Sequence, residues 1–272
     1  MNLIDKFIFA YSRWIPNKVI DILNLIYLLG HKTKCFWFYR NFDMFGYVTI
    51  EFHRECNRKC SYCPKSKEKT ELKGTLTKED LGRILIDLRK LNYKGAFLIS
   101  GFCEPLLDPL IEKKIYFIRK KFKKNKIFVY TNGDFLNLEN FNFFKKNNIK
   151  LIVSLHEPHD VNKKNKIKKI KSYYSDIQIK ENMENDYLSS RGGMVEVNRK
   201  EKKIICIKPI VNLTIDCFSN IILCPDDFFS KEVLGNIKNK SIKNIWFSKR
   251  YKKVRKILGI KKSKTDLCDF CK

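Results

Sequence analysis

The sequence lacks two features that would place the chain in or across a membrane. Near its start Asp5 and Lys6 come almost at once, with no apolar core and small-residue cleavage pattern after them, so we expect no secretory signal. Residues 15–29 are apolar, but Lys18 and Asp21 interrupt them, and the uncharged remainder is shorter than the ~20 residues that span a bilayer. We expect a cytoplasmic protein. Its N-terminal amphipathic helix should pack on the domain, with peripheral contact to a membrane surface as the alternative.

Acidic residues are scarce, with 29 Asp and Glu against 56 Lys and Arg and a formal net charge of +27. Such an excess is common in proteins that bind nucleic acid, anionic lipid or acidic substrates. Here lysine recurs with Asn, Ile and Phe along the whole length, which indicates a compositional bias rather than one basic face. The basic run at residues 163–169 is typical of a solvated helix face. We therefore do not expect nucleic acid as a partner.

The chain also lacks internal repeats and low-complexity linkers, and its 272 residues with 44% hydrophobic content suffice for one α/β domain with a smaller appendage. Because we expect no secretory signal, we also expect a reducing context, where clustered cysteines bind metal more often than they pair. The ten cysteines are Cys35, Cys56, Cys60, Cys63, Cys103, Cys206, Cys217, Cys224, Cys268 and Cys271.

One group of closely spaced cysteines has only three members. Cys56, Cys60 and Cys63 are spaced C-x3-C-x2-C directly after an apolar run. Iron-sulfur cubanes normally take four cysteines, so three thiolates on one loop would hold a cluster and leave one iron free for another molecule. A disulfide framework fits poorly because the number is odd. A structural zinc site is the other alternative, with His53 as a fourth ligand.

Strand and helix patterns alternate along the first 180 residues, which favours a parallel sheet with crossover helices. We expect the strands at residues 47–52, 96–100, 127–130, 151–155 and 176–180. We expect helices from the cap Thr77 through Leu88 and at residues 109–122, 138–146 and 163–174, with an aromatic connector at residues 36–45. In such folds ligands bind at the carboxyl ends of the strands. The cysteine loop and residues 101–105, 131–133 and 154–156 follow different strands and should converge there.

The cysteine loop, with Tyr62 before its last cysteine, resembles the motif of the radical S-adenosylmethionine (radical SAM) enzymes. The resemblance covers roughly residues 47–180 and implies an α/β fold, a partial (β/α)6 radical SAM barrel. It implies that Cys56, Cys60 and Cys63 hold a 4Fe-4S cluster whose open iron is chelated by SAM. One-electron reduction would then cleave SAM to a 5′-deoxyadenosyl radical, which abstracts hydrogen from the substrate.

The same resemblance implies a SAM site at the barrel mouth. Gly101 and Glu104 match in part the family's glycine-rich element, although its second glycine is a phenylalanine here, and Glu104 offers an acceptor for the SAM ammonium. Asn132 and Ser154 occupy strand ends that often touch SAM in this family, and turn formation or strand termination is their alternative role. Tyr62 would lie near the adenine, or else in the core.

A second cysteine set resembles the short iron-sulfur extension called a twitch, or SPASM-like, domain. It consists of Cys206, Cys224, Cys268 and Cys271, which would ligate all four irons of an auxiliary 4Fe-4S cluster and suit it to electron transfer. A zinc site of the same four cysteines is the alternative, and Cys217 is the spare. We expect an N-terminal helical region at residues 1–45, the barrel at residues 46–190 and the twitch domain at residues 191–272.

The spacing of this second set resembles that of superfamily members that oxidise a secondary alcohol of a cyclitol to a ketone. The resemblance implies a sugar or cyclitol substrate, an electron donor such as flavodoxin or ferredoxin, and electron transfer to the auxiliary cluster. Arg191 is the candidate catalytic residue for a substrate-hydroxyl contact, and His156 and Glu157 are further candidates. The alternatives are a SPASM-type maturase with a peptide substrate, an RNA-modifying radical SAM enzyme, and a non-catalytic zinc or iron-sulfur protein.

Overall fold

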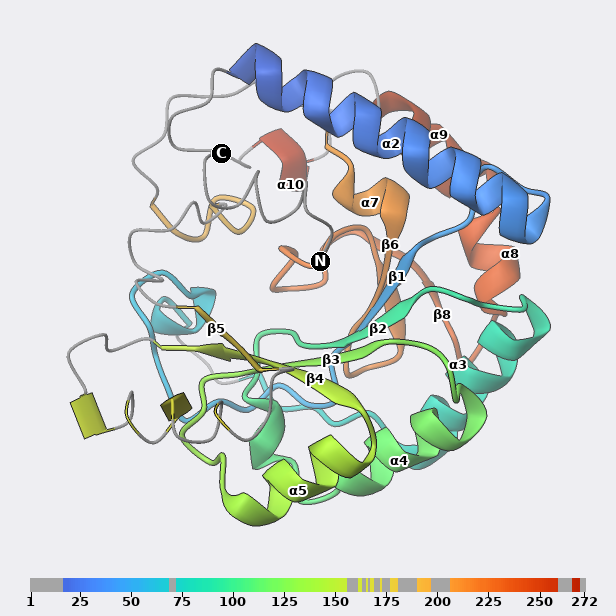
Figure 1. The fold of residues 1–272 in the computed structure, drawn as a ribbon. Helices are drawn as coiled ribbons and strands as arrows, with labels where there is room; N and C mark the ends of the chain where they lie inside the picture. Colours follow the sequence, from blue (N-terminus) through green and yellow to red (C-terminus); the bar gives the residue numbers. More distant parts are fainter. Residues whose placement is uncertain are drawn as a thin grey trace.

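A single sheet of eight strands, in the order β5-β4-β3-β2-β1-β6-β7-β8, organises the computed structural model (Figure 1). The structure describes residues 17–68, 72–155, 161–162, 165, 167–168, 172, 177–180, 190–196, 206–258 and 266–269. The strands are β1 (Tyr47–Ile50), β2 (Ala96–Ile99), β3 (Ile127–Thr131), β4 (Ile149–Ser154), β5 (Ile177–Lys180), β6 (Asn212–Ile215), β7 (Asn220–Ile222) and β8 (Val233–Asn236). The helices are α2 (Asn17–Tyr39), η1 (Pro64–Ser66), α3 (Lys78–Lys90), η2 (Pro105–Leu107), α4 (Ile111–Lys121), α5 (Leu138–Lys146), α7 (Lys208–Val211), α8 (Ile242–Trp246), α9 (Lys249–Leu258) and α10 (Asp266–Asp269).

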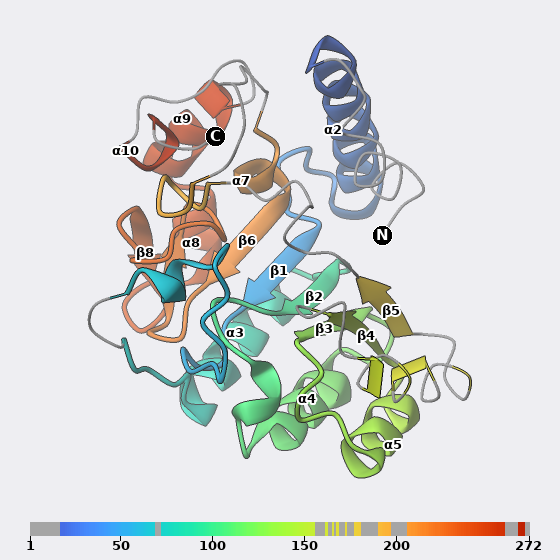
Figure 2. The ribbon, with the colours of Figure 1, turned by 90° about the vertical axis from the view of Figure 1, so that its left-hand side faces the viewer.

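The expected alternation of strand and helix is confirmed from β1 to β4, and β1 to β5 all pair in parallel. The expected helix at residues 163–174 lies mostly outside the described residues. Helices α3, α4 and α5 lie on one face of the sheet, where Figure 2 shows them side by side below it. The strand residues that face them are apolar and fully buried, as Val48 and Ile50 on β1 are. Their neighbours Thr49 and Glu51 point to the opposite face. That opposite face forms the interior of the partial barrel; it is polar on β1 and β6 and carries the apolar residues Ala96, Phe128 and Ile152 on β2, β3 and β4.

Helix α3 begins as its sequence predicts. The Thr77 side chain accepts a hydrogen bond from the Asp80 backbone N–H at 3.0 Å, which satisfies one of the unpaired donors of the first turn. Glu79 and Asp80 add negative charge at the positive end of the helix. Leu81, with Ile84, Leu85 and Leu88 after it, is buried at helical spacing against the sheet.

Helix α2 is longer than expected, since it runs through residue 39 into the segment predicted as an aromatic connector. Tertiary contacts explain the difference. Cys35 is buried, and the Tyr39 hydroxyl accepts a hydrogen bond from the Lys94 backbone N–H at 2.6 Å. In the part of the chain that the structure describes, no helix is long and apolar enough to cross a membrane.

The C-terminal section completes the sheet of the barrel. Strand β6 pairs with β1 in parallel, with Thr49 beside Thr214, and β7 and β8 follow it in antiparallel order. Strands β6 and β7 form a hairpin that turns at residues 216–219. Helix α8 packs on α3, where the Ile242 N–H donates to the Asp87 carboxylate at 2.8 Å. The sheet is continuous across the predicted boundary at residues 190 and 191, while the domain limits themselves stay a prediction.

Candidate active site

A cavity of about 400 Å³ opens at the carboxyl ends of the strands. It brings together residues that the sequence places far apart. The predicted site residues that line it are Cys56, Cys60, Tyr62, Cys63, Gly101, Glu104, Asn132, Ser154 and Arg191. The rest of its wall comes from the inner faces of β1 and β6 with the loops that follow them, from the β2 loop and the end of β3, and from Lys208 of α7. Convergence of the strand ends is thus observed, and the individual roles of these residues stay predictions.

The loop thiols are partly buried. Burial raises the pKa of Cys56 to about 11, and it also raises the pKa of Cys63. A bound cationic cluster would reverse this effect by stabilising the thiolates. Among the described residues, no three His, Cys, Asp or Glu side chains converge closely enough to share a single metal ion. A cubane does not need such convergence, because each cysteine binds a different iron. The three thiols line the same cavity.

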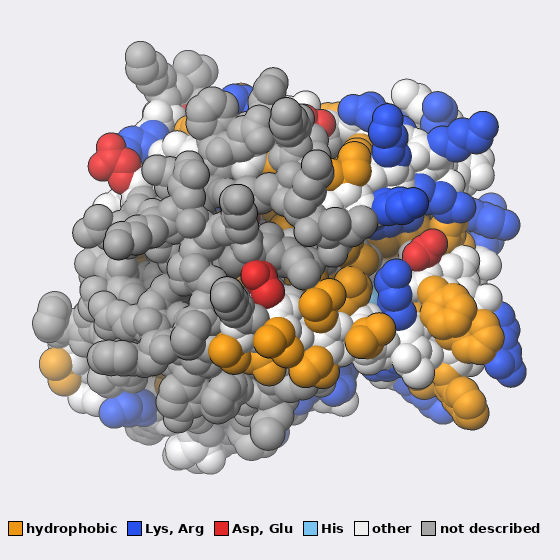
Figure 3. All heavy atoms as spheres, turned by 90° about the horizontal axis from the view of Figure 1, so that it is seen from above, with side chains coloured by type: hydrophobic (Ala, Val, Ile, Leu, Met, Phe, Trp, Pro, Cys, Tyr) orange, Lys and Arg blue, Asp and Glu red, His pale blue; other side chains and the backbone are white. Residues whose placement is uncertain are grey.

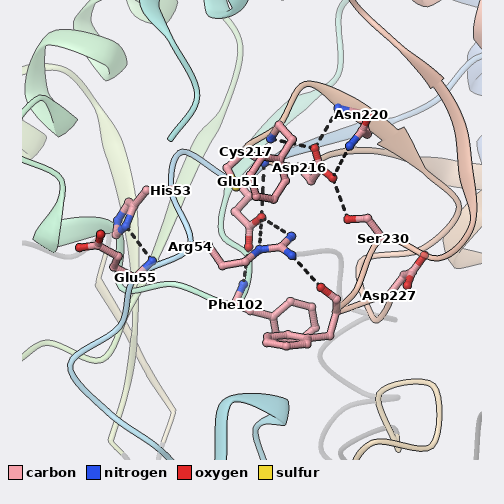
Figure 4. A network of polar contacts seen from close by, with 12 residues as sticks. Glu51, His53, Arg54, Glu55, Phe102, Asp216, Cys217, Asn220, Asp227 and Ser230 are labelled. Carbon is pink, nitrogen blue, oxygen red and sulfur yellow. Dashed lines mark hydrogen bonds and ion pairs between the residues drawn. The ribbon is translucent and has the colours of Figure 1, made fainter. Parts of the chain in front are cut away.

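His53 is occupied by the backbone. Its Nε2 lies 3.0 Å from the Glu104 carbonyl oxygen, and its Nδ1 accepts a hydrogen bond from the Glu55 N–H at 3.1 Å (Figure 4). Burial lowers the pKa of this imidazole, which favours the neutral ring that donates from Nε2 and accepts at Nδ1. Both ring nitrogens therefore have partners other than a metal, which argues against His53 as the fourth ligand of a zinc site on the loop.

A polar clamp holds the cysteine loop to the turn after β3. Arg58 donates to the Asp134 carboxylate from Nε at 2.5 Å and from a terminal nitrogen at 2.9 Å. Asn57 donates to the same carboxylate at 2.7 Å, and its own oxygen accepts from the Asn132 side chain at 2.8 Å. Bidentate Arg–carboxylate pairs fix geometry as well as contribute energy. The loop therefore sits at a defined position relative to the β3 end.

Glu104 is almost fully buried, and its carboxylate already has protein donors. Thr131 and the Leu106 N–H donate to one oxygen at 2.6 and 3.0 Å, and the Asn132 N–H donates to the other at 2.7 Å. Burial raises the pKa of Glu104, and these hydrogen bonds partly offset the effect. The residue thus ties the ends of β2 and β3 together. The predicted contact to the SAM ammonium would be an additional bond on a carboxylate that is already oriented.

A buried ion pair forms part of the cavity wall (Figure 4). Arg54 is 2% exposed and donates to the Glu51 carboxylate from Nε at 3.1 Å and from a terminal nitrogen at 2.7 Å. Its other terminal nitrogen donates to the Phe228 carbonyl at 2.8 Å. Glu51 also accepts from the N–H groups of Phe102 and Cys217, at 3.0 and 3.4 Å. This pair joins β1, the β2 loop and the loop after β6, three segments distant in sequence.

Arg191 is ion-paired at the cavity wall. It forms an ion pair with Asp226, and Lys208 pairs with the other oxygen of that carboxylate at 2.5 Å. Burial lowers the pKa values of Arg191 and Lys208, but the charge of Asp226, its hydrogen bonds and the nearby cysteines together raise them by more, so that both end above their usual values. Two fixed cations therefore face the cavity around one buried carboxylate. The sequence placed Arg191 on a polar turn, and it adopts φ of 51° there.

The described cysteines of the second set lie near this group. Cys224 is buried, and its Sγ accepts a hydrogen bond from the Asp226 N–H at 3.4 Å. Burial raises the pKa of its thiol well above the usual value, and the neighbouring Asp226 and Cys206 add to the effect. Cys206 and Cys268 are partly buried and pack against the same core. The fourth predicted ligand, Cys271, lies outside the described residues, as do His156 and Glu157.

Family models match both cysteine-bearing parts of the chain. Residues 50–184 match the model of the radical SAM superfamily. Residues 206–272 match SPASM, an iron-sulfur cluster-binding domain. The chain belongs to the radical SAM superfamily. It is therefore a radical SAM enzyme whose cofactors are SAM and iron-sulfur clusters.

Individual relatives share both parts. The chain is 26% identical over 236 residues to the S-adenosyl-L-methionine-dependent 2-deoxy-scyllo-inosamine dehydrogenase of Niallia circulans, covering 84% of this chain and 93% of the relative. The crystal structure of BtrN in complex with AdoMet and 2-DOIA matches with a TM-score of 0.75 and 26% identity, over 84% of this chain and 93% of that one. An open conformation of BtrN matches with a TM-score of 0.65 and 23% identity, over 83% and 91% of the two chains, and supports the fold.

This radical SAM chain has donor sets that fit its cofactors. Three cysteine thiols line one cavity beside the partly matched glycine-rich element. The cavity leaves space in front of the thiols for SAM. Cys206, Asp226 and Lys208 lie near Cys224, so a second cluster held there would have charged side chains beside it. Thiolates are the usual ligands of such clusters. Assignment of each cysteine to a cluster stays a prediction.

Residues on the inner faces of β1 and β6 escaped the sequence analysis of this radical SAM chain. Thr49 exchanges hydrogen bonds with Asn212 at 2.9 and 3.1 Å. The Thr214 hydroxyl lines the cavity, is buried, and has no hydrogen-bond partner among the described residues. Strand alternation is the signal that could have found them, because both threonines alternate with fully buried aliphatic residues. Thr49 and Thr214 lie beside each other because β1 pairs with β6. Local sequence patterns do not show this pairing.

A smaller, mainly apolar cavity of about 240 Å³ lies against the first. Tyr27 of α2 contributes to its wall, together with apolar residues of β2, β3 and β4. Tyr130 and Lys208 line both cavities. These two side chains therefore form the partition between the polar site of the radical SAM enzyme and an apolar space beneath α2.

Proposed function

We propose that this radical SAM enzyme oxidises a secondary alcohol of a sugar or cyclitol to a ketone. The observation that carries the proposal is the likeness to a dehydrogenase over nearly the full length of that relative, with the auxiliary iron-sulfur domain included. The solved relative binds 2-DOIA together with AdoMet. Polar groups at the cavity wall suit a substrate that carries several hydroxyl or amino groups.

Cys56, Cys60 and Cys63 would hold the SAM-binding cluster, and Cys206, Cys224, Cys268 and Cys271 the auxiliary one. When bound, these groups supply a carbon radical that removes the carbinol hydrogen atom and an acceptor for the remaining electron. The clamp between Arg58 and Asp134 would keep the thiols of the first set in position. Tyr62, Gly101, Glu104, Asn132 and Ser154 would form the SAM site.

The chain itself must orient the alcohol and accept its hydroxyl proton. Arg191 and Lys208 are held cationic by Asp226 and would bind the substrate oxygen, which gains negative charge as its proton leaves. The unpartnered Thr214 hydroxyl, within the described residues, would bind another substrate group. These cations share one wall of the cavity with the polar strand faces, so a polyhydroxylated ring would be bound through several atoms at once.

Asp227 is our candidate for the base. Of the carboxylates that line this end of the cavity, Asp216 accepts four hydrogen bonds, from the N–H groups of Phe218 and Asn220, the Asn220 side chain and Ser230. Glu51 is engaged with Arg54. Asp227 accepts bonds from the backbone N–H groups of Lys231 and Glu232, at 2.9 and 2.8 Å, one on each oxygen. Each of its oxygens therefore keeps capacity for a further hydrogen bond from substrate.

Isotope transfer tests the proposal. The protein is reconstituted with iron and sulfide without oxygen, reduced, and given SAM with aminocyclitols or sugars deuterated at the carbinol carbon. We expect deuterium in 5′-deoxyadenosine and a ketone product in equal amount. SAM cleavage without deuterium transfer from any alcohol, or transfer from a peptide instead, would contradict the proposed substrate class.

The variant Asp227→Asn separates the base from the radical step. We expect ketone formation to fall by about 10²–10⁴-fold, the usual contribution of general-base catalysis, while SAM cleavage without substrate is unchanged. Glu232→Gln is the matched control and should keep activity. It changes a neighbouring carboxylate but leaves the Glu232 backbone N–H from which Asp227 accepts a hydrogen bond. Equal loss of SAM cleavage in Asp227→Asn would indicate a structural role, as would a lowered urea midpoint.

A further inference from the structure

Several polar side chains of helix α2 face the domain. Asn24 and Cys35 are buried, and His31 is partly buried. The His31 Nε2 lies 2.9 Å from the Met44 carbonyl oxygen, and the Cys35 thiol donates to the same oxygen at 3.1 Å. These contacts attach the helix to the segment before β1. Asp21, Asn24, Leu28, His31 and Cys35 recur at helical spacing, so they define one inner side of α2.

The outer side of α2 is apolar. It consists of Val19, Ile22, Leu25, Ile26 and Leu29, which are 41, 54, 42, 51 and 66% exposed. A surface helix of a water-soluble domain normally has the reverse arrangement, with its apolar stripe toward the core and its polar face outward. Five aliphatic side chains on one outward face exceed what scattered exposure explains, and such patches mark interaction sites.

Aromatic residues extend the outer side at the C-terminal end of the helix. Trp37 is 75% exposed, and Phe36, Phe38 and Phe42 are also exposed. The Phe36 and Phe42 rings stack with centroids 4.5 Å apart, and Arg40 lies over Phe36. Figure 3, which views this face from above, shows hydrophobic side chains in a row with Lys and Arg side chains beside them. Aromatic rings with nearby cations are typical of the interface between lipid headgroups and acyl chains.

The charge of the chain distinguishes between two possible partners of this surface, a second copy of the chain and an anionic membrane. Lys32, Lys34 and Arg40 belong to the same segment, and the whole chain carries a formal net charge of +27. A second copy would bring the same charge, and strong net charge keeps proteins apart. An anionic lipid surface is attracted instead, because each Lys or Arg close to it adds to the binding. From the inverted helix and this charge we propose that the outer side of α2 lies on an anionic bilayer, with the helix axis parallel to the membrane plane.

The parallel orientation follows from the inner side. A helix that is attached to the domain through His31 and Cys35 along one side can insert only its opposite side. Insertion would then bury the aliphatic row and Trp37 to the depth of the headgroups. It would leave the active-site cavity outside the bilayer, because that cavity is lined by the strand ends and their loops and none of its lining residues belongs to α2.

Vesicle binding tests the proposal with the full-length reconstituted protein. Sedimentation is measured with vesicles of phosphatidylcholine alone and of phosphatidylcholine with phosphatidylglycerol. We expect strong binding to the anionic vesicles, weaker binding to the neutral ones, and a decrease as salt rises. The variant Ile26→Gln with Leu29→Gln should lower the partition coefficient on anionic vesicles by about ten-fold or more, because two apolar side chains no longer insert.

A matched control uses apolar side chains that are equally exposed elsewhere. Ile86 on α3 and Leu138 on α5 are 48 and 70% exposed. The paired variant Ile86→Gln with Leu138→Gln should bind vesicles as the unchanged protein does. Absence of vesicle binding would overturn the proposal, as would equal binding by the α2 variant, which would indicate charge alone. If the protein does not bind vesicles but forms a dimer in light scattering, and the α2 variant does not form it, the surface would belong to contact with a second copy instead.

Discussion

At the scale of single residues, the site of this radical SAM enzyme is built from charges that each have a partner. Arg54 pairs with Glu51, and Asp226 binds both Arg191 and Lys208. Removal of Arg54 would leave Glu51 as an uncompensated buried charge, which costs several kcal/mol. These pairs also set electrostatics, since they keep cations facing the cavity at neutral pH. Their geometry therefore matters more for function than their net contribution to stability.

The clamp at Asp134 supplies a prediction at this scale. Arg58 and Asp134 are about one-fifth exposed and form a bidentate pair, so we expect a coupling free energy of about 1–2 kcal/mol. A double-mutant cycle of Arg58→Ala and Asp134→Ala, measured by urea unfolding at constant iron content, gives the value. The pair Lys238 and Asp80 is the control, because its lysine is 54% exposed and should couple by less than about 1 kcal/mol. Additive effects at the clamp would contradict the positioning role.

At the scale of elements, helix termini follow the residue types that their sequences carry. Thr77 caps α3, Ser241 caps α8, and Asn137 forms a capping box with Asn140 at the start of α5. Each cap satisfies N–H groups that the helix itself leaves unpaired. Helix α3 is of particular importance, because it covers the buried faces of the central strands whose ends form the site. Its stability therefore bears on the position of the cysteine loop.

Loss of the α3 cap should be measurable. The change Thr77→Ala removes the acceptor of the Asp80 N–H and should lower the free energy of unfolding by about 1 kcal/mol. Chemical denaturation with circular dichroism gives the number. Lys78→Ala changes the next residue, which is exposed, and should have an effect under about 0.5 kcal/mol. Equal effects of the two changes would mean that the hydroxyl contributes nothing to the helix start.

At the scale of the whole molecule, one sheet joins the radical SAM barrel to the iron-sulfur extension. Strand β6 pairs with β1 and carries Asp216 at its end, and the following turns carry Cys224 and Asp226. The auxiliary domain is thus placed beside the cavity by hydrogen-bonded strands. Arg191, from the segment between the two parts, completes this arrangement by pairing with Asp226.

Metal content tests whether the two cysteine sets are independent. The reconstituted protein should hold about eight irons, two cubanes' worth. The variant Cys224→Ala with Cys268→Ala should lose about four of them, retain part of its SAM cleavage, and form no ketone. The control Cys35→Ala, at a buried cysteine on α2, should keep all eight. Zinc in place of the second four irons, or loss of all cleavage, would contradict a separate auxiliary cluster.

Much of the fold and part of the site could be predicted from local patterns. Alternating aliphatic runs located β1 to β5, and Thr77 located the start of α3. Parallel topology was enough to bring Gly101, Asn132 and the cysteine loop to one mouth. The limits of α2 were predicted wrongly, because Tyr39 is held by Lys94, a contact between segments distant in sequence. No local pattern contains such information.

The sequence by itself determined the three-thiol loop, the second cysteine set and the polar residues at the strand ends, because motif spacing and strand period are local properties. Only the tertiary structure decided their partners. It paired Thr49 with Asn212, clamped Arg58 to Asp134 and enclosed Asp226 between Arg191 and Lys208. It also turned the apolar side of α2 outward. Composition and periodicity show that a helix has an apolar side, whereas contacts between distant segments decide which side faces the protein.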